Sequence, residues 1–419
     1  MYRYMHEFVA NKKLLVIGYV WPEPKSSAAG SRMLQLIDVF LSENYDVTFA
    51  SPCAKTDNAF HLNAIGVSQQ TIALNNSSFD AFIKTLNPSA VLFDRFMMEE
   101  QFGWRVAEQC PKAVRILDTE DLHFLRKGRQ QAFKVGKSFN KTHLFSDIAK
   151  REIASIYRCD LSLIISKAEM EILANTFKVD KSLLLYLPFM IDDILEIDFA
   201  KFPKFEERNH FVTIGNFLHE PNYNAVLYLK ETIWPLIRKQ LPKAELHVYG
   251  AYVSEKVNQL HNVKQGFLIK GFADDVNEVM QNAKVCLAPI RFGAGLKGKL
   301  VDAMQNGTPV VTTSIGAEGM EELINTCGCI ADTPEDFTEK TVNIYKNKLL
   351  WDEKSAGTNP VLNQFFNKNK YRKVLVEAIQ NTLNHLNEKR QNNFVGQMLM
   401  HHSLQSTKYL SKWIEEKNS

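Results

Sequence analysis

The residues best suited to chemistry lie in a glycine-rich loop within Val285–Met320, between an apolar run and a helical pattern. Gly293, Gly295 and Gly298 have the spacing G-x-G-x-x-G, and Lys297 and Lys299 stand among them. Glycines allow close approach to the backbone, and N–H groups at a helix N-terminus favour anions. Because a helix terminus contributes only about 0.3–1 kcal/mol per charge, a dianion also needs a cation. The loop is therefore predicted to hold a diphosphate, with Lys297 as its cation.

The residues after this loop do not fit a nicotinamide dinucleotide site. Such a site requires an acid after the next strand, whereas PVVTTS ends in Thr and Ser. Asp302, about one turn into the predicted helix, can instead accept hydrogen bonds from a ribose diol. The alternative for Asp302 is that it only complements the helix dipole.

A second group of polar residues follows apolar runs in the N-terminal half. DTEDLHFL supplies Asp121 and His123, DRFMMEE supplies Asp94, and Gly30 lies in the loop after the first run. Polar groups at the carboxyl ends of parallel strands face the ligand cleft of a doubly wound sheet. The alternatives are a capping or surface role for His123, a loop-fixing pair of Asp94 with Arg95, and an ordinary turn glycine at position 30.

Apolar runs of strand length alternate with helical periodicity in two series. The first series is 14–20, 46–51, 90–94, 113–118 and 161–166; the second is 211–216, 245–250, 285–289 and 309–313. Strands buried on both faces and separated by helices indicate parallel sheets covered on both sides. We predict an α/β protein with two Rossmann-like doubly wound domains, residues 1–190 and 210–390, joined by a linker at 191–209 and followed by a helix at 391–419.

The glycine-rich stretch resembles the donor-binding segment of the retaining glycosyltransferase family with the GT-B fold, glycosyl transferases group 1 or family 4-like. The family pattern is P-x-x-x-G-x-G-[IL]-[KR]-x-K-x-x-[ED]-A-M-x-x-G-x-P-V-V-x-T-x-x-G-x-E-G. Similarity extends to residues 214–237 and to the start of the chain. The matching residues are Pro289, Gly293, Gly295, Leu296, Lys297, Lys299, Asp302, Ala303, Met304, Gly307, Pro309, Gly316, Glu318 and Gly319.

This resemblance implies a division of roles between the domains. The second domain would bind a nucleotide-diphosphate sugar through Gly215, Asn216, Arg291, Gly293, Ala294, Gly295, Lys297, Asp302 and Glu318. The first domain would bind the acceptor, with Gly30, Asp94 and Asp121 at the acceptor and phosphate loop. His123 and Lys297 would be catalytic. Asp302 matches the second acid of the family's E-x7-E pair, but Ala294 stands where the first Glu is expected.

The resemblance also implies retention of anomeric configuration and a C-terminal helix that returns to the first domain. We expect that helix to bury Tyr409 and Trp413, which are spaced i, i+4. The expected enzyme is a hexosyltransferase of polysaccharide biosynthesis. The alternatives are a catalytically degenerate GT-B protein that binds a nucleotide sugar without turnover, and a sugar-nucleotide epimerase of the same fold.

The remaining composition limits cofactors and partners. No D-x-D triplet occurs, and six scattered cysteines lack paired CxxC spacing, so no metal and no other cofactor is expected. A net charge of +3 gives no nucleic-acid signature. Residues 112–151 carry ten Lys/Arg against four acids, a charge of +6, so the rest of the chain has a charge of −3. We expect this segment to bind a glycan or lipid-linked anionic acceptor, or an anionic membrane surface. With no spanning run or signal peptide, a cytoplasmic, peripheral protein is expected.

Overall fold

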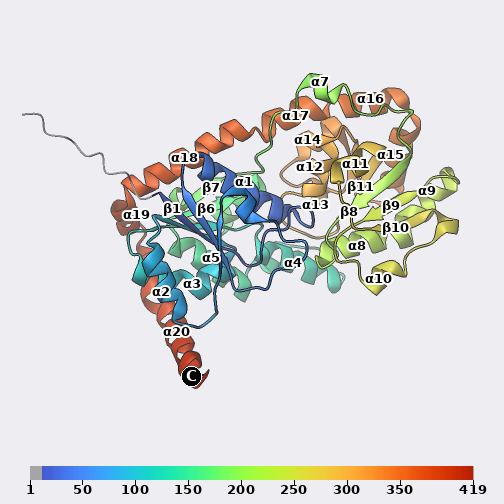
Figure 1. Ribbon diagram of the computed structural model, residues 1–419. Helices are drawn as coiled ribbons and strands as arrows, with labels where there is room; N and C mark the ends of the chain where they lie inside the picture. The colour runs from blue at the N-terminus through green and yellow to red at the C-terminus, as the bar shows by residue number, and fades with distance from the viewer. Residues whose placement is uncertain (1–11, 419) are drawn as a thin grey trace, which may run out of the picture.

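The first domain is built on a seven-stranded parallel sheet (Figure 1). The computed structural model describes residues 12–418. The strand order is β3-β2-β1-β4-β5-β6-β7, with β1 Lys13–Ile17, β2 Asp46–Ser51, β3 Ser68–Thr71, β4 Ala90–Asp94, β5 Val114–Asp118, β6 Leu161–Ile164 and β7 Leu184–Tyr186. Alternate residues of β1 enter opposite cores: Leu15 and Ile17 pack on one face, Leu14 and Val16 on the other. This two-sided burial explains the continuous apolar runs.

Helices cover both faces of this sheet. On one face lie α2 Ser78–Leu86, α3 Phe96–Gln109, α4 His123–Lys134 and α5 Asp147–Arg158. The other face is covered by α1 Ala28–Ser42 and by the distant α18 Lys368–Asn384. The short α6 Lys167–Glu171 follows β6 toward the second domain.

The second domain has a six-stranded parallel sheet in the order β10-β9-β8-β11-β12-β13. Its strands are β8 His210–Ile214, β9 Leu246–Tyr249, β10 Phe267–Gly271, β11 Ala283–Ala288, β12 Val310–Thr312 and β13 Gly328–Ile330. Its helices are α8 Glu220–Tyr228, α9 Trp234–Gln240, α10 Glu255–Asn258, α11 Val276–Asn282, α12 Gly298–Gln305, α13 Ser314–Ala317, α14 Glu321–Cys327, α15 Pro334–Lys346, α16 Lys348–Ala356 and α17 Thr358–Phe365; α7 Glu196–Phe199 lies in the linker. The predicted α/β fold of two doubly wound domains is confirmed.

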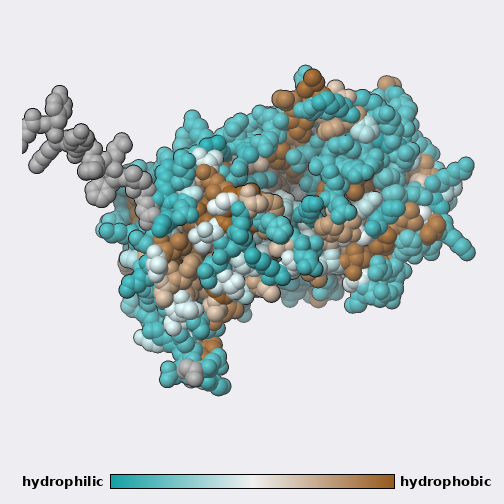
Figure 2. Space-filling view, viewed as in Figure 1, coloured by the Kyte–Doolittle hydropathy of each residue, from teal (hydrophilic) through white to brown (hydrophobic). Residues whose placement is uncertain are grey.

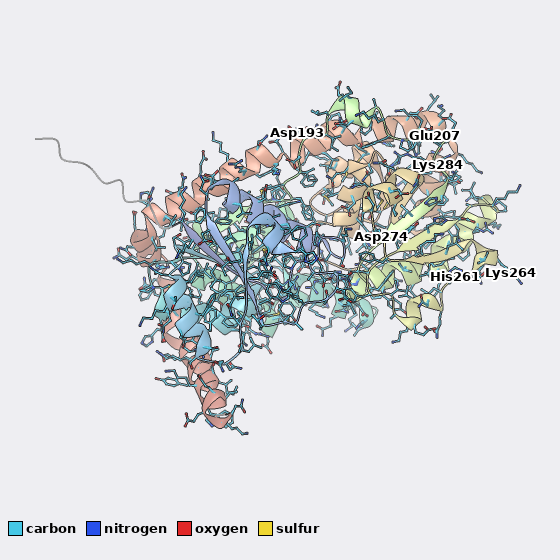
Figure 3. The ribbon with its side chains drawn as sticks, in the orientation of Figure 1. Asp193, Glu207, His261, Lys264, Asp274 and Lys284 are labelled. Atoms are coloured by element: carbon cyan, nitrogen blue, oxygen red, sulfur yellow. The ribbon has the colours of Figure 1, made fainter. Side chains whose placement is uncertain are left out.

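The chain returns to the first domain earlier than residue 390, the predicted end of the second domain. The N–H of Ile191 donates to the Phe366 carbonyl at 2.8 Å. Next to it, the Asn367 side-chain amide donates to a carboxylate oxygen of Asp193, which is labelled in Figure 3. Immediately afterwards α18 runs along the first domain (Figure 1). Tyr371 and its i+4 and i+8 neighbours, Leu375 and Ile379, pack into the first domain's core. The helix therefore belongs there because its apolar stripe is buried there.

The last helices, α19 Leu386–Asn392 and α20 Phe394–Asn418, also lie against the first domain, where α20 contacts α3 and α5. The predicted burial of Tyr409 and Trp413 is wrong, since these side chains are 64% and 60% exposed. Ser411 faces inward instead, and its hydroxyl accepts from Arg105 at 3.3 Å. Positions two residues away on a helix point about 200° apart, so burial of Ser411 turns Tyr409 and Trp413 outward.

Candidate functional site

A cleft of about 1410 Å³ lies between the two domains, and Figure 2 shows the surface hollowed there. Every predicted site residue except Arg291 and Glu318 lines it. Those present are Gly30, Asp94, Asp121, His123, Gly215, Asn216, Gly293, Ala294, Gly295, Lys297 and Asp302. The carboxyl ends of both parallel sheets open onto this cleft, as doubly wound domains require. The fold thus gathers residues separated by more than 250 positions in sequence.

The donor-side loop between β11 and α12 has the geometry expected of an anion cradle. Gly295 has a φ of +64°, a conformation that other residues rarely adopt. A Cβ on Gly298 would lie 2.5 Å from the Ala28 Cβ, so glycine lets α12 approach the first domain. Lys297 caps the helix in extended conformation, and its Nζ donates to the carbonyls of Ala294 and Gly295 at 3.1 and 2.6 Å. Burial lowers the pKa of Lys297.

A second lysine lies in the first turn of α12, and an acid follows about one turn later. Lys299 donates to the Asn222 Oδ1 at 2.8 Å, and burial lowers its pKa to about 8. Burial raises the pKa of Asp302 to about 7, although the nearby Lys299 ammonium opposes that rise. Basic and acidic side chains with shifted pKa values in one cleft are typical of binding and catalytic sites. The Lys299 role is visible in the sequence only as a second cation in GLKGK.

On the first-domain side, His123 begins α4 and faces Asp121. The His123 Nε2 lies 3.5 Å from the Asp121 Oδ1, and the Phe96 ring packs edge-on against the imidazole at 5.4 Å. Burial lowers the pKa of His123 to about 3, although Asp121 opposes that shift. Burial works to raise the pKa of Asp121, but Arg126, at 2.7 Å, and His123 hold it well below its usual range. At neutral pH this pair is therefore a neutral imidazole beside an ionised carboxylate.

The ends of β4 and β5 carry a second, strained group of charges. Tyr19 donates its backbone N–H to the Asp94 Oδ2 at 3.0 Å, and Arg95 lies 3.5 Å from Oδ1. Arg95 and Glu120 have φ values of +72° and +62°. Such strain in residues with side chains persists where the surroundings enforce it, commonly at functional sites. Burial raises the pKa of Asp94 and raises that of Glu120 well above its usual range.

Gly30 lies in the first turn of α1, not in the loop before it as the sequence suggested. Its N–H donates to the capping Ser27 hydroxyl at 3.1 Å. A Cβ there would lie 2.4 Å from the Glu23 carbonyl carbon, so only glycine allows the loop to fold over the helix start. Glu23 in turn accepts from the Tyr252 hydroxyl at 2.8 and 2.7 Å, which joins this loop to the second domain.

Arg291 and Glu318 are engaged outside the cleft. Arg291 lies between the rings of Phe133 and Tyr228, at 4.6 and 4.3 Å from their centroids. Glu318 accepts from Arg129 at 2.5 and 2.8 Å. Through Phe133 and Arg129 these two residues link the domains, and their donor contacts stay predictions. Arg129 is one of the residues that sequence reasoning missed.

Glu169 is the other missed residue. Its Oε1 accepts from the N–H of Leu122 and from that of Gly295, both at 2.9 Å, so one carboxyl holds loops of both domains. Its Oε2 is buried without a partner among the described residues, and burial raises the pKa of Glu169 to about 8. Glu169 lies 126 positions from Gly295, and no motif marks it.

Within residues 12–418, no group of three His, Cys, Asp or Glu residues is arranged to hold a metal ion. The same residues contain no helix long and apolar enough to cross a membrane. The face seen in Figure 2 is mostly hydrophilic.

Comparisons with known proteins agree with this geometry. Residues 208–347, which include the donor-side loop and α12, match the family model described as glycosyl transferases group 1. An uncharacterized 44.6 kDa protein in the cps region of Klebsiella pneumoniae is 28% identical over 160 residues, which are 35% of this chain and 40% of that protein. The chain thus spans less than half the length of this curated relative.

Two solved glycosyltransferase-like structures have the same architecture. Sucrose-phosphate synthase from Thermosynechococcus elongatus superposes with a TM-score of 0.66 at 13% identity, over 88% of this chain and 98% of that one. A mutant of S. aureus TarM, bound to fondaparinux, alpha-GlcNAc-glycerol and UDP, superposes with a TM-score of 0.58 at 14% identity. The match covers 72% of this chain and 58% of the TarM chain. The chain therefore has the two-domain GT-B glycosyltransferase fold, and its second domain matches the glycosyl transferases group 1 family.

Proposed function

We propose that this protein transfers a hexosyl group from a nucleotide-diphosphate sugar to a glycan or lipid-linked saccharide. One observation carries the proposal: Lys297 and Lys299 face the cleft at the N-terminus of α12 and, among the described residues, neither has a carboxylate within 4 Å. Two half-buried cations that form no ion pair with a carboxylate of the described residues suit a diphosphate. Asp302, on the same helix, suits the ribose.

The proposed reaction needs no metal. Transfer breaks the bond between the anomeric carbon and the diphosphate oxygen, and the leaving diphosphate gains negative charge. Lys297, Lys299 and the N-terminal dipole of α12 would stabilise that charge. His123, neutral at pH 7, would donate a hydrogen bond to the sugar or acceptor. Retention of anomeric configuration is part of the proposal and rests on the family resemblance.

The relatives support the substrate classes. S. aureus TarM was crystallised with UDP and alpha-GlcNAc-glycerol, and the Klebsiella relative is encoded in a cps region. A nucleoside diphosphate donor and a glycan acceptor are therefore the classes to test first.

We further propose peripheral contact of residues 112–151 with an anionic surface at the cytoplasmic face of a membrane. The structure reduces the charge available for it, because six of the ten cations form ion pairs: Arg115, Arg126, Arg129, Lys134, Lys150 and Arg151. Lys112, Lys127, Lys137 and Lys141 remain exposed. Each would contribute about 1 kcal/mol near such a surface.

The decisive experiment incubates the protein with a panel of nucleotide-diphosphate sugars and saccharide acceptors and follows product by mass spectrometry and anomeric NMR. Transfer with retained configuration, unchanged in EDTA, is expected. Activity that EDTA abolishes and Mg²⁺ restores would contradict the metal-free part. Inverted product would contradict retention.

A second candidate is binding of the nucleotide sugar without turnover. Ala294 favours it, since the carboxylate that the family resemblance places there is missing. Saturable donor binding with no transfer and no hydrolysis would establish this alternative. Interconversion of two nucleotide sugars without acceptor would instead identify an epimerase.

A further inference from the structure

A second pocket lies at the other end of the first domain from the cleft. It encloses about 370 Å³ between β5, α5 and the terminal helices α19 and α20. Arg115, near the start of β5, lines it, whereas the cleft residues follow the opposite end of that strand. The pocket is therefore distinct from the proposed donor and acceptor sites.

The Arg115 guanidinium is buried without adequate acceptors. The residue is only 8% exposed, and its Nε has no hydrogen-bond partner among the side chains and backbone that the structure describes. Its Nη1 meets the Met400 sulfur at 3.4 Å, and its Nη2 is 3.6 Å from the nearest Asp160 oxygen. A guanidinium has five N–H donors, and a thioether is a weak acceptor. A buried polar group so poorly satisfied needs an explanation, and an anion bound in the adjoining pocket is one that would supply the missing acceptors.

The surrounding charges explain why Asp160 cannot satisfy Arg115. Arg390 donates to both Asp160 oxygens at 2.8 Å and so occupies that carboxylate. Arg158, also in the pocket wall, is neutralised by Glu99, whose Oε1 accepts from its Nε at 2.9 Å. Three arginines thus share two carboxylates, and Arg115, whose ion pair with Asp160 is long at 3.6 Å, has the least compensated charge.

We propose that this pocket binds a phosphate-class anion, held by the Arg115 guanidinium between the first domain and the C-terminal helices. A tetrahedral oxyanion accepts several N–H donors of one guanidinium and supplies the missing negative charge. Tyr157, Asn393 and Gln397 add polar groups at the rim. The proposal is independent of glycosyl transfer.

The anion could be free in solution or be the headgroup of a lipid. The lipid source has a structural argument, because α20, which forms one wall of the pocket, carries exposed apolar side chains on its outward side and along its length: Phe394, Val395, Met398, Tyr409, Leu410 and Trp413. Phe394, Met398, Tyr409 and Trp413 fall on one side of the helix at 100° per residue. Aromatic and aliphatic residues on one face of a helix suit a lipid interface.

The test measures thermal stability of the full chain against inorganic phosphate. At phosphate about ten times its dissociation constant, the melting temperature should rise by about 3 °C. Arg115→Gln should abolish the rise, whereas Arg151→Gln, which removes an exposed arginine on α5, should keep it. Met400→Glu places a carboxylate where the Arg115 Nη1 now meets sulfur, and should also abolish the rise while the protein stays folded.

Sedimentation with phosphatidylcholine vesicles, with and without phosphatidic acid, distinguishes the sources. Binding that requires phosphatidic acid and Arg115 supports a headgroup, and a phosphate response without vesicle binding supports a soluble ligand. The proposal is overturned if wild type responds to neither probe, or if Arg115→Gln and Met400→Glu respond as wild type does.

Discussion

The two faces of the cleft differ in how their charges are paired. On the second-domain face, Lys297 and Lys299 donate only to carbonyl or amide oxygens. On the first-domain face, three aspartates already have a cation: Asp121 has Arg126, Asp94 has Arg95, and the buried Asp118 has Arg32 at 2.9 Å.

This difference indicates what each face is built to do. Burying a charge without a partner is costly, so two half-buried lysines with no ion pair to a described carboxylate suit an anion that the proposed ligand would bring. Carboxylates that are paired bring no net charge to a ligand, and they hold loops in place. In the proposed function the second-domain face is the donor face, which would bind charge, and the first-domain face is the acceptor face, which would orient the acceptor and His123.

The largest effect should come from the acceptor face. His123→Ala should lower kcat by about 10²–10³-fold, the usual loss when one oriented hydrogen-bond donor is removed from a reacting centre. Because the pKa of His123 is about 3, wild-type kcat should show no histidine limb between pH 5 and 8. A limb near pH 6.5 that disappears in the variant would show that His123 exchanges a proton.

A change on the proposed donor face should alter the affinity for the nucleoside diphosphate. Lys297→Met should weaken nucleoside diphosphate binding about 10–150-fold, the range of a charge-assisted hydrogen bond, and leave nucleoside binding unchanged. The exposed Lys270 on β10 gives the control variant Lys270→Met. Calorimetry with both ligands measures the difference. Equal losses for nucleoside and diphosphate would place Lys297 away from the phosphates.

The pH dependence of donor affinity tests the proposed role of Asp302. An ionised Asp302 accepts from a ribose diol, and its pKa of about 7 means that protonation begins near neutrality. Wild-type donor affinity should therefore fall as pH drops below 7. Asp302→Asn should cost about tenfold at pH 8 and remove this dependence. Wild-type affinity in the variant would leave Asp302 as a dipole-complementing residue.

The pH dependence of folding stability tests the contact that Glu169 makes between the two faces of the cleft. Its pKa is about 8 in the folded protein against an ordinary 4.5, so the folded state holds the proton longer than the unfolded state. Stability should then fall as pH rises from 4.5 to 8, by up to about 1.4 kcal/mol per pH unit. Glu169→Gln keeps an oxygen for the two N–H donors and should flatten this slope in denaturant titrations. An unchanged slope would assign the pH dependence to other groups.

The strands and the donor loop could be predicted from the sequence because their signals are local. The apolar run 90–94 coincides with β4. The glycines of GAGLKGK and the apolar pattern after them predicted a helix start, and α12 begins at Gly298 within this stretch. Strand β3, with the polar sequence SQQT, and the three-residue β7 gave no such signal. Edge strands need little apolar burial, so their pairing depends on a neighbour.

The sequence by itself determined the two doubly wound domains and most of the predicted residues that line the cleft, because periodicity and strand ends are encoded within a few positions. Only the tertiary structure decided the partners across long separations: Glu169 with Gly295, Arg129 with Glu318, and α18 with the first sheet. It also decided that Tyr409 and Trp413 face outward, because one helix can bury only one side. Which side is buried depends on Ser411 and Arg105, whose contact spans 306 positions.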